Sequence, residues 1–258
     1  MLDQTVRVGI IGVGAIAEAM VEGLCRTDSP PRILLSPRSA QLSRSLAERF
    51  DEVEICPGNQ EVVDGSDIVL LTVRPEDVDD VLSAVRVPRD RLVISAAAGW
   101  SCASLRALLG DVPVVRSIPL PAVRSRDGLT AIFPSHPMAE ELFSRLGGVV
   151  AAPTEEGFSA LSAATAAASS QLRYVAVVSE WLAARGLRPG GADRFARSLF
   201  RGVGRALEDE SRPLDALVAA HETPGGINAE LRGRWLDSGN EERLRDALDR
   251  ILSRVEPS

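Results

Sequence analysis

The stretch VRVGIIGVGAIA, residues 6–17, decides the fold of this chain. Its run from Val6 to Val13 is mostly apolar and predicts a buried strand, and the pattern from Ala15 to Leu24 predicts a helix with small residues on one face. Between the two, the spacing Gly-x-Gly-x-x-Ala marks a tight strand-to-helix turn. Such a turn is typical of a domain that binds a dinucleotide, although the same turn could serve the fold without a ligand.

Each small residue of this turn has its own role in the dinucleotide interpretation. Gly12 permits the sharp turn, Gly14 lets the backbone approach a pyrophosphate, and Ala17 lets helix and strand pack closely. The first helical turn, which includes Ala15 and Ile16, offers free backbone N–H groups and the positive end of the helix dipole. We therefore predict that this turn binds the phosphate groups of a dinucleotide.

The end of the second predicted strand indicates which dinucleotide is bound. The run Ile33–Leu35 is followed by Ser36-Pro37-Arg38-Ser39, with no carboxylate to accept a hydrogen bond from a ribose 2′-hydroxyl. Arg38 can pair with a 2′-phosphate or stack on adenine, and Ser36 and Ser39 add short hydrogen-bond donors. This pattern favours NADP(H). The alternative is a surface turn with a solvated arginine.

Strand and helix patterns alternate as far as Pro153, and only helix patterns follow it. The strands are apolar on both faces, which implies a buried, mostly parallel sheet. We predict an α/β fold with a Rossmann-type, doubly wound domain in residues 1–153 and an all-helical domain in residues 154–258. The longest predicted helix of the second part, Ser159–Ala184, contains Ser169-Ser170 as a point where it could break.

The composition argues against several kinds of chemistry. The 258 residues include no lysine, so all 29 basic residues are arginine, and Schiff-base or acid–base chemistry by lysine is excluded. The net charge of −7, without a basic block, argues against nucleic acid or an anionic membrane as a partner. Three scattered cysteines and two histidines predict no metal site and favour a reducing cytoplasm. The sequence shows neither a leader pattern nor an apolar run of the roughly 20 residues that span a bilayer, so we do not expect a membrane protein.

Several segments together resemble the pyrroline-5-carboxylate reductase family over nearly the whole chain. The most specific is Thr223-Pro224-Gly225-Gly226, which is similar to that family's Ser/Thr-Pro-Gly-Gly-x-Thr loop. The remaining matches are the Gly12–Ala17 motif, Asn59, Val73-Arg74-Pro75 where the family has Val-Lys-Pro, Ser95–Gly99, Tyr174 and Glu180.

The resemblance implies an enzyme of proline biosynthesis that transfers a hydride from NAD(P)H to a five-membered cyclic imine bearing a carboxylate. It also implies that the helical part is a C-terminal dimerisation domain, whose helices interlock to form a homodimer or a larger homo-oligomer with the active site at the interface. The cofactor positions that it adds are Asn59, Thr72, Val73, Arg74, Pro75, Ala97, Ala98 and Gly99. The catalytic, substrate-side positions are Thr223, Gly225, Gly226 and Asn228.

The Pro-Gly-Gly loop by itself also predicts a site for an acid group. Gly225 and Gly226 present consecutive backbone N–H groups at the start of a predicted helix, which suits a carboxylate, and Thr223 and Asn228 flank them. The alternative is a plain turn followed by Asn228 as the helix N-cap; the two roles are compatible, and we predict both an N-cap at Asn228 and a ligand site. Imine reduction also suits a chain without lysine, because a basic imine nitrogen can arrive already protonated.

The departures from the family pattern lie mainly on the substrate side. Arg74 replaces lysine, Ile118-Pro119-Leu120 replaces Met-Pro-Asn, Gln171-Leu172-Arg173 replaces Gly-Pro-Ala, and Asn228 replaces threonine. Three interpretations stay open: an NADPH-dependent reductase of pyrroline-5-carboxylate or a close cyclic imino acid, a different reductase on the same fold that uses a carbonyl or another hydride-carrying cofactor, and a non-catalytic NADP-binding protein. His221 could shuttle a proton or only complement a helix dipole, and Cys102 is expected to be a core or helix-start thiol.

Overall fold

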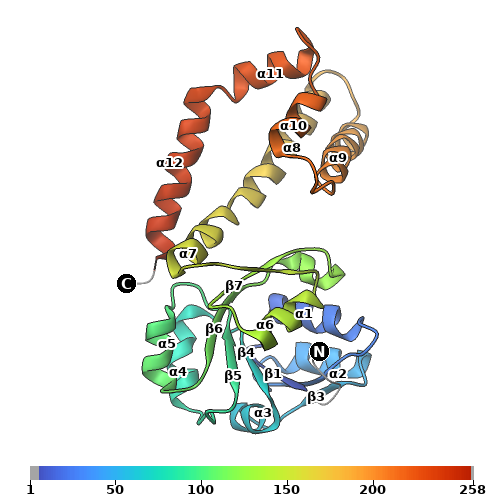
Figure 1. Cartoon of the computed structure of the whole chain (residues 1–258). Coiled ribbons are helices and arrows are strands. Elements are labelled where there is room, and N and C mark those ends of the chain that lie inside the picture. The colour runs from blue at the N-terminus through green and yellow to red at the C-terminus, as the bar shows by residue number, and fades with distance from the viewer. Residues whose placement is uncertain (1–5, 257–258) are drawn as a thin grey trace. The chain divides into compact units, whose positions relative to one another are not determined.

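The structure is a computed structural model that describes residues 6–256. Its N-terminal part is built on one eight-stranded sheet (Figure 1). The strands are β1 (Arg7–Ile11), β2 (Arg32–Leu35), β3 (Val53–Ile55), β4 (Ile68–Leu71), β5 (Leu92–Ser95), β6 (Val114–Ile118), β7 (Thr130–Phe133) and β8 (Val149–Ala151).

The strand order confirms the predicted Rossmann-type sheet. The order is β3-β2-β1-β4-β5-β6-β7-β8, and every neighbouring pair is parallel except β6 and β7. All residues of β4 and β5 are buried, as expected for strands covered on both faces. The chain reverses its winding direction beside β1, and ligands of doubly wound sheets bind at the carboxyl ends of the strands at such a point.

Helices cover both faces of the sheet. They are α1 (Ala15–Cys25), α2 (Ala40–Arg49), α3 (Asn59–Gly65), η1 (Pro75–Asp77), α4 (Val78–Ser83), α5 (Cys102–Leu109), η2 (Pro121–Ser125) and α6 (Pro137–Ser144). One apolar core joins the sheet to α1, α2 and α6, and a second joins it to α3, α4 and α5 (Figure 1). Each large aliphatic side chain buried there contributes about 1.5–3 kcal/mol relative to its exposed state.

Only helices follow β8 within the described residues. They are α7 (Glu155–Ala164), α8 (Ala167–Ala184), α9 (Pro189–Ala206), α10 (Leu214–Ala220), α11 (Ile227–Trp235) and α12 (Ser238–Val255). The predicted break at Ser169-Ser170 is wrong, because α7 and α8 separate at Thr165-Ala166. The Ser169 hydroxyl donates to the Ala166 carbonyl oxygen at 3.2 Å, so this serine satisfies its hydrogen bond along the helix without interrupting it.

The chain forms two compact units, which are described separately. The first runs through Ser162 and takes in the end of α12 from Arg254, and the second comprises Ala163–Ser253. The division therefore falls within α7, later than the change from strands to helices. Its first turns belong with the sheet because Phe158 is buried there beneath the Arg116 guanidinium, whose carbon lies 4.4 Å from the ring centre.

Candidate functional site

The turn at Gly12 is fixed from both neighbouring strands. Gly12 has a φ of +95°, and a Cβ at this position would lie 2.7 Å from the backbone nitrogen of Val73. Its N–H donates to the Ser36 hydroxyl oxygen at 3.1 Å, and its carbonyl oxygen accepts from the Thr72 hydroxyl at 2.7 Å. The ends of β2 and β4 thus hold the turn after β1 in one shape. Glycine is required there for both the backbone angle and the space.

The start of α1 has the features that a dinucleotide pyrophosphate needs. Gly14 is the N-cap residue, with an extended backbone and no side-chain hydrogen bond that caps the helix. A Cβ at Gly14 would meet no atom within 4 Å, so the space in front of the first turn is open. Ala17 is fully buried against the sheet. The first-turn N–H groups, which have no partner inside the helix, can therefore bind a phosphate in that space.

The predicted 2′-phosphate residues after β2 differ in what they offer. Ser36 is buried, and its hydroxyl accepts from Gly12 while its carbonyl accepts from Ser43, so it shapes the turn. Arg38 is exposed, and its two terminal nitrogens lie 3.2 and 3.4 Å from the two carboxylate oxygens of Asp77. Ser39 is half-buried at the N-cap of α2. Arg38 and Ser39 are thus the more accessible candidates.

The loops after β3 and β4 contribute the other predicted cofactor residues. Thr72 and Val73 lie directly against Gly12. The Arg74 side chain is largely exposed and lies 3.9 Å from Glu76. Pro75 opens η1, and its carbonyl oxygen accepts a hydrogen bond of 3.0 Å from the Trp100 indole N–H. Asn59 is half-buried at the first position of α3.

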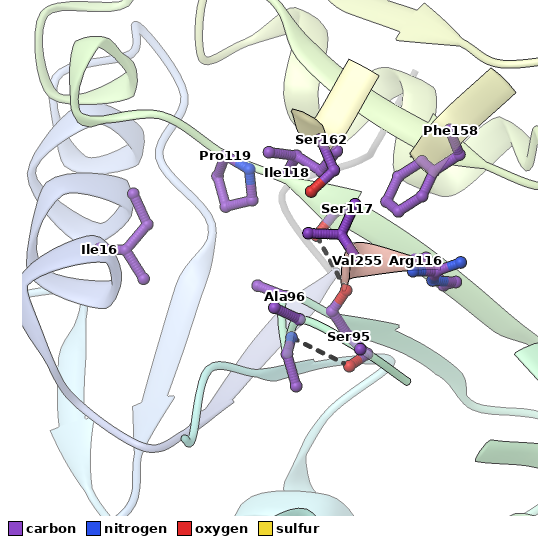
Figure 2. Close-up of a pocket in the computed structure, with 13 residues that line it drawn as sticks. Ile16, Ser95, Ala96, Arg116, Ser117, Ile118, Pro119, Phe158, Ser162 and Val255 are labelled. Atoms are coloured by element: carbon purple, nitrogen blue, oxygen red, sulfur yellow. Dashed lines mark hydrogen bonds between the residues drawn. The ribbon is translucent and has the colours of Figure 1, made fainter. Parts of the chain in front are cut away.

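A cavity of about 260 Å³ opens at the carboxyl ends of β5 and β6. Its walls are made by Ile16, Ser95–Gly99, Arg116–Pro119, Phe158, Ser162 and Val255. Figure 2 shows Ile16 and Pro119 on one side and Arg116 and Phe158 on the other. Ala97, Ala98 and Gly99 carry little or no side chain, so this wall leaves room for a flat ring beside the start of α1.

One charged group in the cavity wall, Arg116, was not predicted from the sequence. Arg116 is 4% exposed, donates to Glu155 at 2.9 Å and leaves its Nε without a hydrogen-bond partner. The same Glu155 oxygen accepts from the backbone N–H of Cys102 at 2.8 Å. Its charge within an apolar strand pattern was a signal that the sequence offered, but the partner Glu155 lies 39 positions away and could not be identified from local spacing.

The cysteine beside this cluster is not an activated nucleophile. Cys102 is buried at the first position of α5. Burial, followed by the negative charge of Glu155, raises the pKa of its thiol to about 11. The thiol is therefore protonated near neutral pH, as a core or helix-start cysteine would be.

The Pro-Gly-Gly loop lies in the second compact unit. Gly225 has a φ of +71°, and the Gly226 N–H donates to the Thr223 carbonyl oxygen at 2.8 Å. The prediction of Asn228 as the N-cap is wrong: Gly226 caps α11, and the Asn228 amide instead donates to the His221 carbonyl at 2.6 Å. That bond ties α11 to the end of α10 and uses one of the two N–H donors of the Asn228 side-chain amide. Proximity of this loop to the glycine turn stays a prediction.

His221 is engaged within its own helix end. Its Nδ1 lies 2.8 Å from the Leu217 carbonyl oxygen. Next along the chain, Glu222 accepts two hydrogen bonds from Arg232, at 2.5 and 3.0 Å. These contacts brace the loop between α10 and α11 from both sides.

Comparison with known proteins places the chain in a family. Residues 7–99 match the family described as NADP oxidoreductase, coenzyme F420-dependent. The chain is 31% identical to the pyrroline-5-carboxylate reductase of Synechocystis sp., over 76% of this chain and 75% of that protein. It belongs to the pyrroline-5-carboxylate reductase family. The resemblance identified from its motifs is thereby confirmed.

Solved structures of this family share the fold. A pyrroline-5-carboxylate reductase from Coxiella burnetii has a TM-score of 0.83 at 24% identity and covers 97% of both chains. The pyrroline carboxylate reductase of Plasmodium falciparum, with NADP bound, has a TM-score of 0.81 at 14% identity and covers 98% of both chains. These matches show that the chain shares the fold of these reductases.

Residues 6–256 offer neither a metal-binding cluster nor a membrane-spanning helix. No group of three or more histidine, cysteine, aspartate or glutamate side chains is placed to hold a metal ion. No helix in the same range combines the length and apolar character that a bilayer span requires.

Proposed function

We propose that this protein is an NADPH-dependent reductase of a cyclic imino acid, which converts 1-pyrroline-5-carboxylate to proline or reduces a close analogue. The observation that carries the proposal is the open, uncapped start of α1 at Gly14 beside the cavity walled by Ala97–Gly99, in a chain of this family. When bound, a reduced nicotinamide supplies the hydride that the imine carbon accepts.

The chain itself contributes binding and orientation. The N–H groups at the start of α1 hold the phosphates, and the apolar wall of Ile16, Pro119 and Ala97–Gly99 keeps water from the face of the ring. The Gly226 N–H is used by the Thr223 carbonyl oxygen, so the N–H groups of the first turn of α11 are the ones suited to the substrate carboxylate. A protonated imine needs no strong protein acid, which agrees with a cavity wall that presents arginine and serine but no carboxylic acid or histidine.

The direct test follows NADPH absorbance with 1-pyrroline-5-carboxylate and with six-membered cyclic imino acids. We expect oxidation of NADPH with at least one of them. The six-membered ring is included because Leu120 stands where the family has asparagine and because the Asn228 side-chain amide already donates one hydrogen bond to the His221 carbonyl oxygen. NADPH binding without turnover of any imine would favour the non-catalytic alternative, and turnover only of a carbonyl compound would favour a different reductase.

Replacement of Arg38 by alanine should remove most of the preference for NADPH over NADH. A charge-assisted contact to a 2′-phosphate accounts for about a tenfold difference in affinity. The measurement is the thermal shift at matched NADPH and NADH concentrations, which reports the ratio of ligand concentration to Kd. Arg44→Ala, which removes an exposed arginine from α2, is the matched control and should keep the preference. Equal shifts from both cofactors in the unaltered protein would refute the role of Arg38.

The helical unit supports the homodimer that the family resemblance implies. On α9, Ala192 and Ala196 are buried, whereas Phe195, Leu199 and Val203 recur every four residues on another face and are 56%, 49% and 39% exposed. An apolar stripe of this kind marks an interface. We propose that a second copy of the chain covers this stripe.

The three cysteines are free, which supports the reducing cytoplasm as the location.

The double substitution Phe195→Glu, Leu199→Glu is expected to convert the oligomer to a monomer. Burying two carboxylates in an apolar interface, with no cation to pair with them, carries a desolvation penalty of several kcal/mol per charge and so disfavours association. Sedimentation velocity at several protein concentrations measures the outcome, with Arg201→Glu on the same helix as the control that stays oligomeric. A monomeric unaltered protein, or a double variant with unchanged sedimentation, would refute the interface.

A further inference from the structure

An ion pair bridges the two loops that flank the glycine turn. Arg38 follows β2 and Asp77 ends η1 after β4, and these two strands lie on either side of β1. Both terminal nitrogens of Arg38 face both oxygens of Asp77, at 3.2 and 3.4 Å. The turn directly after β2, residues 36–39, contains no carboxylate, but the fold brings the Asp77 carboxylate to Arg38 from the loop after β4.

Asp77 is the more firmly placed member of this pair. Its backbone N–H donates to the Arg74 carbonyl at 3.0 Å, and the start of the same turn is tied to Trp100 through the Pro75 carbonyl. The Asp77 side chain is 28% exposed, against 69% for Arg38. The carboxylate is therefore presented from an anchored turn to a largely solvated guanidinium.

We infer that Asp77 is a cofactor-specificity residue, which engages the Arg38 guanidinium and lowers the preference for NADPH over NADH. The inference rests on the proposed NADP(H) site. A 2′-phosphate carries about 1.5 to 2 negative charges, so it must compete with Asp77 for Arg38 and is repelled by the carboxylate. A 2′-hydroxyl meets neither penalty and can donate to a carboxylate. Asp77 thus acts against the 2′-phosphate both through Arg38 and directly.

The test uses Asp77→Asn and two nucleotide fragments that differ only in the 2′-phosphate. Adenosine 2′,5′-bisphosphate should bind the variant about fivefold more tightly than the unaltered protein in isothermal titration calorimetry at low ionic strength. Adenosine 5′-monophosphate should bind both proteins alike. Salt at about 0.5 M should remove most of the gain, because it screens exposed charges. Glu76→Gln, which removes the neighbouring carboxylate of the same turn, is the matched control and should change either affinity less than about twofold.

The outcomes separate this inference from the function on which it rests. If the unaltered protein binds neither fragment, the NADP(H) site and the role of Asp77 both fall. If it binds them and Asp77→Asn gives no gain for the bisphosphate, only the role of Asp77 is overturned. An equal gain from Glu76→Gln would also overturn it, because the effect would then be general charge removal. A purely structural role for Asp77 would alter the binding of both fragments together.

Discussion

Replacing Gly14 with aspartate is expected to weaken NADPH binding by at least about a hundredfold while leaving the unliganded protein as stable as before. The backbone at Gly14 is extended, a conformation open to any residue, and an added Cβ would meet no atom within 4 Å, so the substitution is expected to fit the fold without strain. Aspartate is also a favourable N-cap, and its carboxylate would accept hydrogen bonds from N–H groups that now lack a side-chain cap.

The same carboxylate would occupy the space that the pyrophosphate requires. Two unit charges 4 Å apart repel by about 4 kcal/mol at an effective dielectric constant near 20, which is more than the roughly 2.7 kcal/mol of a hundredfold loss. Thermal unfolding without ligand and titration with NADPH measure the two effects separately. Gly14→Asn, with nearly the same size and no charge, should lose less affinity. An aspartate variant that retains NADPH affinity would show that the pyrophosphate does not bind here.

The fold and the position of the cofactor turn were predictable because local sequence patterns specify them. The apolar runs that became β4 and β5 are buried on both faces, which only a covered parallel sheet provides. Gly12 is required by its backbone angle, a φ of +95°, and this requirement acts within the turn itself. Periodicity and glycine spacing carry such information directly.

The electrostatic partners were not predictable, since they depend on residues that only the folded sheet brings together. Ser36 reads as an available donor in sequence, yet its hydroxyl is used to hold the Gly12 turn. The position of Asp77 opposite Arg38 depends on β2 and β4 lying on either side of β1. The N-cap of α11 was assigned wrongly for a local reason: Asn228 is a good capping residue, but its amide bonds back to His221.

Glu155→Ala is expected to lower the free energy of unfolding of the first compact unit by about 2–4 kcal/mol. The substitution leaves the Arg116 guanidinium, which is 4% exposed, without its carboxylate partner. Removing one member of a buried ion pair costs about 3–5 kcal/mol, and the lower range is used because the Glu155 side chain is 32% exposed. The Cys102 N–H at the start of α5 also loses its acceptor.

Three further variants test whether the loss of stability comes from leaving Arg116 unpaired or from removing any negative charge from α7. Glu156→Ala removes a neighbouring exposed carboxylate from the same helical turn and should change the free energy of unfolding by less than about 0.5 kcal/mol. Glu155→Gln keeps an oxygen acceptor and should destabilise the protein less than Glu155→Ala.

Combining Arg116→Met with Glu155→Ala should recover part of the lost stability, because no unpaired charge is left in the cavity wall. Urea unfolding followed by circular dichroism measures these four variants, the single variant Arg116→Met and the unaltered protein. If the double variant were as unstable as the sum of the single ones, the two side chains would be energetically independent, and the arginine would owe its place to the Phe158 ring rather than to Glu155.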